Sequence, residues 1–356
     1  MKKIIVFFCL FLLFPVNCLG IMDTSHSSIV MDIDSGRILY QKDSNTRRLI
    51  ASTTKLMTFL VTISSAKNKL DNNVIVGDEV LKMYGTNMYL NLNEELTLRD
   101  LLYGLMLRSG NDASVVISKF VGGNIDNFVY LMNEKAKEIG MQNTIFKNPH
   151  GLDEETKNYS TAYDMAVLTR YLYLNYPDFI EIAGSKYYDF ASNLKSYSLV
   201  NRCKIIFTYK YTTTCKNGYT PLAGKSLVTT ASNNNLNLLI VTLDDFDIYD
   251  NHKRLYDYYF NLYKNELIID KNKFTIPNKA NYFIKNNFYY PLKENEINSI
   301  NKKIILDDKE NSLGKIQIIL NDNVIHEEII YKEINNKKEN KSIFSNLKKI
   351  VKNLFR

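Results

Sequence analysis

Residues 50–63 read IASTTKLMTFLVTI and contain a serine, Ser52, three positions before a lysine, Lys55. Residues at this spacing share one face of a helix. The apolar residues that follow fall on most sides of that helix, which predicts that the helix is buried. An amine beside a hydroxyl can activate a serine without a histidine. The competing interpretation is that Ser52 is an ordinary helix N-cap.

The spacing Ser-x-x-Lys alone carries little information, because it recurs at Ser64/Lys67, Ser192/Lys195 and Ser345/Lys348. Two other triplets make the Ser52/Lys55 pair more significant than the other pairs with this spacing. Ser109-Gly110-Asn111 follows a predicted helix, and Lys216-Asn217-Gly218 lies on a predicted strand. A serine with a lysine, then Ser-x-Asn, then Lys-x-Gly, in this order, is the pattern of one class of active-site serine enzymes.

The predicted elements around these motifs indicate an α+β fold. Residues 28–41 predict two short strands around a Ser35-Gly36 turn. Helices are predicted after Thr97, after Asn111 and after Thr161, and again over 251–263. Residues 194–243 have a β pattern, with 204–214 counted as strand and a turn at 233–235. The sequence therefore predicts helices combined with an antiparallel sheet.

The chain is long enough for two domains, and its composition changes near residue 267. Residues 21–266 are predicted to form the main domain. Residues 267–334 hold only short strands and turns, including a hairpin around 321–323, which predicts a small, all-β, sandwich-like domain.

Residues 1–20 have the features of a secretory signal peptide. Two lysines precede a short apolar run over 4–14, which is too short to span a bilayer, and breaker residues follow. Cleavage is expected near Gly20, with a lipid anchor on Cys18 as a minor alternative. The protein is therefore expected to be exported.

Residues 335–356 are predicted to form a basic amphipathic helix. Most of the chain's net charge of +7 lies here, since residues 337–356 hold seven basic residues and one acidic residue. Apolar residues recur along one face over 340–356, so we expect this segment to lie on an anionic membrane surface. A helix docked on its own domain is the alternative. A nucleic-acid-binding protein would carry its charge on a face or groove instead.

The cysteines and histidines predict no metal site and no cofactor. Cys203 and Cys215 are the cysteines outside the export segment, and either a disulfide or two free thiols fits an exported chain. The four histidines are scattered along the chain without ligand spacing.

The sequence resembles the D-alanyl-D-alanine carboxypeptidases among the low-molecular-mass penicillin-binding proteins. The resemblance covers roughly residues 25–265 and is carried by "IVMDIDSGRILYQKDSNTRRLIASTTKLMT", "ELTLRDLLYGLMLRSGNDAS", "FKNPHGLDEETKNYSTAYDMA" and "KNGYTPLAGKSLV". It implies a β-lactamase/transpeptidase-like sheet with helices. It also implies an enzyme of the cell wall, at the outer face of the bacterial cytoplasmic membrane.

The resemblance also implies roles for named residues. Ser52 would attack the penultimate D-alanine of a peptidoglycan stem peptide ending in D-Ala-D-Ala, and β-lactams would acylate it. Lys55 would act as its neutral base, beside Ser109 and Asn111. The residues implied in substrate binding are Lys216, Asn217, Gly218, Tyr219, Thr220 and His252, with the backbone amides of Ser52 and Tyr219 as oxyanion donors.

Departures from the family pattern leave alternatives open. Asn217 stands where the family usually has a hydroxyl residue that contacts the substrate carboxylate, and Ile50 replaces a usual proline. For His252, a surface histidine is the competing interpretation. A class A-like β-lactamase, a DD-endopeptidase and a catalytically weakened cell-wall binding protein are the other candidate functions.

Overall fold

The computed structural model describes residues 21–276, 282–309 and 312–332. The predicted export segment and the predicted terminal helix both lie outside these ranges. The chain divides between Asn261 and Leu262 into two compact units. Within the described ranges, no helix has the length and apolar character needed to cross a bilayer, and no group of side chains could hold a metal ion.

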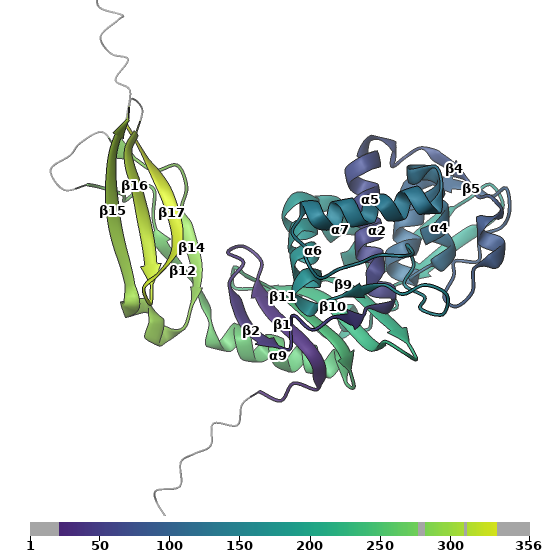
Figure 1. Cartoon of the computed structure of the whole chain (residues 1–356), viewed down its shortest axis with the longest axis horizontal. Coiled ribbons are helices and arrows are strands. Elements are labelled where there is room, and N and C mark those ends of the chain that lie inside the picture. Colours follow the sequence, from purple (N-terminus) through teal and green to yellow (C-terminus); the bar gives the residue numbers. More distant parts are fainter. Residues whose placement is uncertain (1–20, 277–281, 310–311, 333–356) are drawn as a thin grey trace, which may run out of the picture. The chain divides into compact units, whose positions relative to one another are not determined.

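The first unit is built on a five-stranded antiparallel sheet (Figure 1). In spatial order its strands are β2 (Ile38–Lys42), β1 (Ser25–Asp32), β11 (Leu236–Asp245), β10 (Gly224–Asn233) and β9 (Thr212–Thr220). The central strands are almost wholly buried, as expected for a sheet covered on both faces. The third sequence motif lies on β9, at the edge of this sheet.

Helices cover one face of the sheet, and α2 (Lys55–Ala66) runs through their centre (Figure 1). The prediction that this helix is buried is confirmed, since Phe59, Leu60 and Ile63 have no exposed surface. The other helices of this layer are α3 (Leu98–Tyr103), α4 (Asn111–Gly122), α5 (Ile125–Glu138), α6 (Ala162–Asn175) and α7 (Pro177–Gly184). The predicted capping box is present at the start of α3, where the side chain and backbone of Thr97 and Asp100 cap each other.

Short elements join the helical layer. The paired strands are β3 (Arg48–Leu49) with β6 (Tyr159–Ser160), β4 (Asn73–Ile75) with β5 (Glu95–Thr97), and β7 (Tyr187–Ala191) with β8 (Ser196–Val200). The short helical turns are η2 (Ala51–Thr54), η3 (Lys67–Lys69), η4 (Asp78–Lys82) and the π-helical η5 (Gly104–Arg108).

One predicted strand segment is helical. Residues 204–214 were expected to be β, but α8 (Ile205–Thr208) precedes β9. Ile205 and Ile206 are both buried. A strand would send consecutive side chains to opposite faces, whereas one helical turn buries both. A disulfide between Cys203 and Cys215 ties this turn to β9 and settles the alternative left open by the sequence.

The opposite face of the sheet is covered by α9 (Ile248–Leu262), an amphipathic helix (Figure 1). Its buried side includes Leu255, Tyr256 and Tyr259. The hydroxyl groups of Tyr256 and Thr229 on β10 lie 2.7 Å apart, which joins the helix to the sheet.

The second unit is all-β in the residues described. Its larger sheet has the order β13 (Tyr282–Phe283), β17 (Asn323–Lys332), β16 (Ser312–Leu320), β15 (Ile300–Lys309). A second pair is β12 (Lys264–Ile269) with β14 (Phe288–Leu292), and η6 (Glu294–Ser299) precedes β15. Its core includes Ile316, Ile318 and Ile330. Asn321 and Asp322 form the predicted turn, both with positive φ.

Candidate active site

Ser52 lies in η2, the turn that leads into α2. The preceding residue, Ala51, has a φ of +45°, a left-handed conformation that carries backbone strain in a residue with a Cβ. The cap position of η2 is Ile50, and no side chain caps η2 or α2. Ser52 is therefore not an N-cap, and its partly exposed hydroxyl is held at the start of a rigid, buried helix.

The amine of Lys55 meets three oxygen atoms although its side chain has no exposed surface. Nζ lies 3.0 Å from Ser52 Oγ, and it donates to Asn111 Oδ1 at 2.8 Å and to the carbonyl of His150 at 2.6 Å. Ser52 and Lys55 are neighbours along the chain, and the fold brings Asn111 to them from a position 56 residues after Lys55.

Burial lowers the pKa of Lys55 well below its usual value, and the nearby amine of Lys216 lowers it further. A neutral amine has two N–H groups and one lone pair. If the N–H groups serve Asn111 and His150, the lone pair faces the hydroxyl of Ser52. This is the arrangement that a general base requires.

Ser109 and Lys216 form a second pair. Ser109 ends the π-helical η5 with a φ of +60°, so its side chain leaves the helix at an unusual angle. Lys216 Nζ donates to Ser109 Oγ at 3.0 Å and to the carbonyl of Asn217 at 2.8 Å. Burial, and then the charge of Arg202, lower the pKa of Lys216 to about 7.

The loop over residues 83–93 holds Asn111. Asn111 donates from Nδ2 to the carbonyl of Tyr84 at 2.7 Å, and from its backbone amide to the carbonyl of Thr86 at 2.8 Å. The next residue, Asp112, accepts from the backbone amides of Met88 and Leu90. The side-chain oxygen that orients Lys55 is therefore set by the path of this loop.

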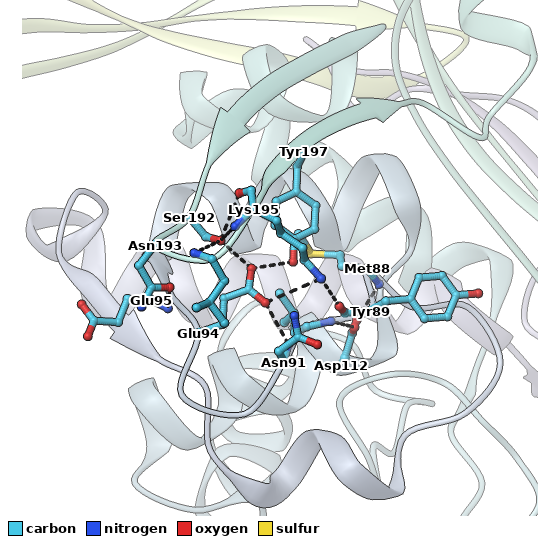
Figure 2. A network of polar contacts seen from close by, with 12 residues as sticks. Met88, Tyr89, Asn91, Glu94, Glu95, Asp112, Ser192, Asn193, Lys195 and Tyr197 are labelled. Atoms are coloured by element: carbon cyan, nitrogen blue, oxygen red, sulfur yellow. Dashed lines mark hydrogen bonds and ion pairs between the residues drawn. The ribbon is translucent and has the colours of Figure 1, made fainter.

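A buried carboxylate anchors the same loop from the other side (Figure 2). Glu94 is fully buried and accepts hydrogen bonds from the Asn91 amide, the Ser192 hydroxyl and the Tyr197 hydroxyl. Lys195 Nζ lies 3.8 Å from Glu94 and donates to the carbonyl of Tyr89 (Figure 2). The tip of the β7–β8 hairpin is thus joined to the loop over 83–93.

Two glycines allow backbone segments to approach Ser52. A Cβ on Gly218 would lie 2.9 Å from the amide nitrogen of Ser52. Gly151 has a φ of +92°, and a Cβ there would overlap the carbonyl of Ala51. Only glycine permits such contacts. The strand around Gly218 and Tyr219 therefore lies directly against the turn that carries the serine.

The side chains of Asn217 and Thr220 both form hydrogen bonds to other residues of the protein. Asn217 Nδ2 donates to the hydroxyl of Tyr249 at 3.3 Å. Thr220 is buried, and its hydroxyl donates to Asp153 and accepts from the backbone amide of Ala223. The Thr220 hydroxyl therefore holds the end of β9, and its role in substrate binding stays a prediction.

The position of His252 contradicts both interpretations made from the sequence, a substrate-binding residue and a surface histidine. It is fully buried, which excludes a surface histidine. Nδ1 lies 2.8 Å from Thr229 Oγ1 and Nε2 lies 3.0 Å from Thr242 Oγ1, so both ring nitrogens are occupied between α9 and the sheet. Burial lowers the pKa of His252 to about 4. His252 is a neutral packing residue and does not reach the cleft at Ser52.

Sequence reasoning missed several contributors. The carbonyl of His150 holds Lys55, and backbone atoms leave no side-chain signal. Arg202 was missed because it belongs to no motif, although its charge acts on Lys216. The hint was its place beside Cys203, whose disulfide partner Cys215 directly precedes Lys216.

The comparisons with known proteins agree with this geometry. Residues 22–247 match the family model described as D-alanyl-D-alanine carboxypeptidase. The chain is 38% identical over 220 residues to the D-alanyl-D-alanine carboxypeptidase DacF of Bacillus subtilis, covering 60% of this chain and 56% of that protein. It is 32% identical over 231 residues to DacA of Haemophilus influenzae, covering 62% of this chain and 57% of that protein. The chain thus spans less than two thirds of these relatives.

Solved structures share the fold. Penicillin binding protein 5 from Haemophilus influenzae aligns with a TM-score of 0.74 at 25% identity, over 88% of this chain and 97% of that one. A D-alanyl-D-alanine carboxypeptidase from Mycobacterium tuberculosis aligns with a TM-score of 0.66 at 29% identity, over 70% and 96%. The predicted fold of antiparallel sheet, helices and an all-β C-terminal region is confirmed. Since the family model matches more than half of its residues, the chain belongs to the D-alanyl-D-alanine carboxypeptidase family.

Proposed function

We propose that this protein is a serine D-Ala-D-Ala carboxypeptidase that removes the terminal D-alanine from peptidoglycan stem peptides, and that β-lactams acylate it. The observation that carries the proposal is the buried Lys55 amine, 3.0 Å from Ser52 Oγ and held by Asn111 and the His150 carbonyl. A lysine used only for structure has no need to be desolvated beside a partly exposed hydroxyl.

In the proposed first step, the lone pair of Lys55 accepts the proton of Ser52, and Ser52 Oγ bonds to the carbonyl carbon of the penultimate D-alanine. The backbone amides of Ser52 and Tyr219 are the proposed donors to the resulting oxyanion. The closeness of Gly218 to the Ser52 amide supports this pairing, because it brings β9 against the serine turn.

In the second step, the peptide bond breaks and the departing D-alanine nitrogen takes up a proton. Ser109 is proposed to relay to this nitrogen the proton that Lys55 accepted from Ser52, so that Lys55 is neutral again; the Lys216 amine holds the Ser109 hydroxyl at 3.0 Å. Water then attacks the acyl-enzyme, and Lys55 accepts a proton from the water. Lys55 returns this proton to Ser52 Oγ as the acyl bond breaks, which leaves the shortened peptide and free Ser52.

The alternative functions have less support. Rapid β-lactam hydrolysis in class A-like enzymes uses a positioned glutamate. Among the residues described, no carboxylate hydrogen-bonds Ser52 or Lys55; Asp153 and Glu154 instead contact Thr220 and Tyr84. Catalytic decay is disfavoured because the Lys55 amine keeps its contacts with Ser52 and Asn111, and the Lys216 amine keeps its hydrogen bond to Ser109.

The test uses intact mass spectrometry after exposure to penicillin, together with D-alanine release from a pentapeptide analogue. The wild type should gain one drug adduct on Ser52 and release D-alanine, whereas Ser52→Ala should do neither. Fast drug turnover without an adduct would favour a β-lactamase, and an adduct in Ser52→Ala would refute the assignment of the nucleophile.

The proposed place of action is the outer face of the cytoplasmic membrane. The support is the charged and apolar pattern of residues 1–20 and the basic amphipathic pattern of 340–356. Deleting 340–356 should leave activity on soluble peptide unchanged and release the protein from anionic vesicles. Unchanged vesicle binding after the deletion would contradict the membrane-surface proposal.

A further inference from the structure

The two firm acceptors of the Lys55 amine depend on two different loops. Asn111 Oδ1 accepts one hydrogen bond, and the Asn111 side chain is itself held by the loop over residues 83–93. The backbone carbonyl of His150, in the loop over residues 148–157, accepts the other. The direction of the lone pair on Lys55 therefore depends on how these two loops are held relative to each other.

One side-chain hydrogen bond, here called the loop bridge, joins the two loops. The hydroxyl of Tyr84 donates to Oε2 of Glu154 at 2.9 Å. Among the residues that the structure describes, no other hydrogen bond connects 83–93 with 148–157. Both ends of the bridge are close to the acceptors of Lys55, because the carbonyl of Tyr84 accepts from Asn111 Nδ2 at 2.7 Å and Glu154 soon follows His150.

The loops also pack against each other beside Asn111. Gly85 has a φ of +77°, and a Cβ there would lie 3.2 Å from Asn111 Nδ2 and 3.7 Å from a methyl carbon of Leu152. A residue with a Cβ would be strained in this conformation and would press on Asn111. Glycine at this position lets the loop lie close to both residues, and the preceding Tyr84 then reaches the second loop.

Other contacts hold each loop without joining the two. In the first loop, the carboxylate of Asp112 accepts from the backbone amides of Met88 and Leu90. In the second loop, Oδ1 of Asn148 accepts from the backbone amide of Gly151 at 2.6 Å. The loop bridge is thus the hydrogen bond that sets the position of one loop against the other.

We infer that Tyr84 and Glu154 are positioning residues for the proposed base, because their hydrogen bond holds together the two loops that orient Lys55. The inference rests on the proposed carboxypeptidase function and deepens it. Both residues act through Asn111 and His150. Without the bridge the two acceptors separate, the lone pair of Lys55 turns away from the Ser52 hydroxyl, and water reaches the amine.

The bridge acts through its hydrogen bond rather than through the charge of Glu154. Among the described residues, the charged groups that act on the Lys55 amine are Lys216 and Asp112. His150 is neutral, since burial lowers its pKa to about 3. The contact between Tyr84 and Glu154 is exposed, so solvent and salt screen the carboxylate charge.

The test measures the rate at which penicillin acylates Ser52, followed by intact mass spectrometry. Tyr84→Phe removes the donor and Glu154→Ala removes the acceptor, whereas Glu154→Gln keeps an acceptor oxygen without the charge. At neutral pH the first two variants should react about fivefold more slowly than the wild type, and Glu154→Gln should stay within about twofold of it. The matched control is Tyr89→Phe, because Tyr89 is an exposed tyrosine of the same loop whose ring points away from the polar network (Figure 2).

The pH profile of acylation separates positioning from a general loss of structure. Water that reaches Lys55 weakens the burial that lowers its pKa, so this pKa should rise in Tyr84→Phe and in Glu154→Ala. Acylation of these variants should begin at higher pH, and their difference from the wild type should shrink as the pH rises. The double variant Tyr84→Phe/Glu154→Ala should react no more slowly than either single variant, because both changes remove the same bond.

The outcomes separate this inference from the proposed function. A wild-type rate in Tyr84→Phe, a rate in Glu154→Gln as low as in Glu154→Ala, a loss that is equal at every pH, or losses that add in the double variant would overturn the role of the bridge. Each of these results leaves the nucleophile assigned to Ser52. A wild-type protein that gains no penicillin adduct and releases no D-alanine would instead overturn the proposed function, and the inference with it.

Discussion

Replacing Lys216 with methionine should remove a distinctive pH dependence of stability. The Lys216 side chain is 1% exposed, and its pKa falls from 10.5 to about 7 in the folded protein. Below pH 7 the amine is charged in both the folded and unfolded states, so the full cost of burying a charge is present. Between pH 7 and 10.5 only the unfolded state holds the proton, and stability therefore rises with pH.

The size of this effect on the free energy of unfolding follows from the shift in the pKa of Lys216. Each pH unit between the two pKa values adds about 1.4 kcal/mol to the free energy of unfolding, or about 5 kcal/mol in total. Because pH 7 is the midpoint of the folded-state titration, the gain between pH 7 and pH 9 is about 2 kcal/mol. The methionine variant lacks this contribution. Lys55, whose pKa is lowered mainly by its own burial, remains in both proteins.

Urea unfolding of wild type and Lys216→Met at pH 7, 8 and 9 measures the difference. The wild type should gain about 2 kcal/mol relative to the variant over this range, while exposed Lys210→Met should follow the wild type. The variant should also lose D-alanine release, because Ser109 loses its partner. Stability curves of wild type and Lys216→Met that stay parallel within about 0.5 kcal/mol would refute the lowered pKa.

Further changes test the supports of the site. Asn111→Ala should reduce kcat/KM on the order of 100-fold without a matching fall in melting temperature, because Lys55 loses the oxygen that orients it; activity near the wild-type value would contradict this role. Glu94→Gln should cost about 2 kcal/mol in thermal unfolding, since a buried acceptor of three hydrogen bonds is weakened; an unchanged melting temperature would argue against the anchor. Reducing the Cys203–Cys215 disulfide should cost about 3 kcal/mol, seen as a lower melting temperature with dithiothreitol, and the double Cys→Ser variant should be insensitive to the reductant.

Local patterns predicted much of the fold because they are decided within a few residues. The capping box at Thr97 and Asp100, the buried helix after Ser52 and the turn at 321–323 all form where their side chains predict. Residues 204–208 went against their β pattern because tertiary burial of Ile205 and Ile206 outweighs a weak local preference.

The order and spacing of residue types also identified the candidate nucleophile and its base. Ser52 and Lys55 are one helical turn apart, so their proximity follows from local geometry. His252 shows the limit of such reasoning. Its position in the sequence is compatible with a substrate contact, but burial between α9 and the sheet depends on which helix face packs inward.

The sequence by itself determined the three motifs, the two-part organisation and the enzyme family. Only the tertiary structure decided that Lys55 is desolvated, that Lys216 and Arg202 lie within electrostatic range, and that Tyr84 and Glu154 join two loops. The physical reason is that pKa values and contacts between loops depend on burial and on distances through space. Those distances join residues that the chain separates by more than a hundred positions, as it does Lys216 and Ser109.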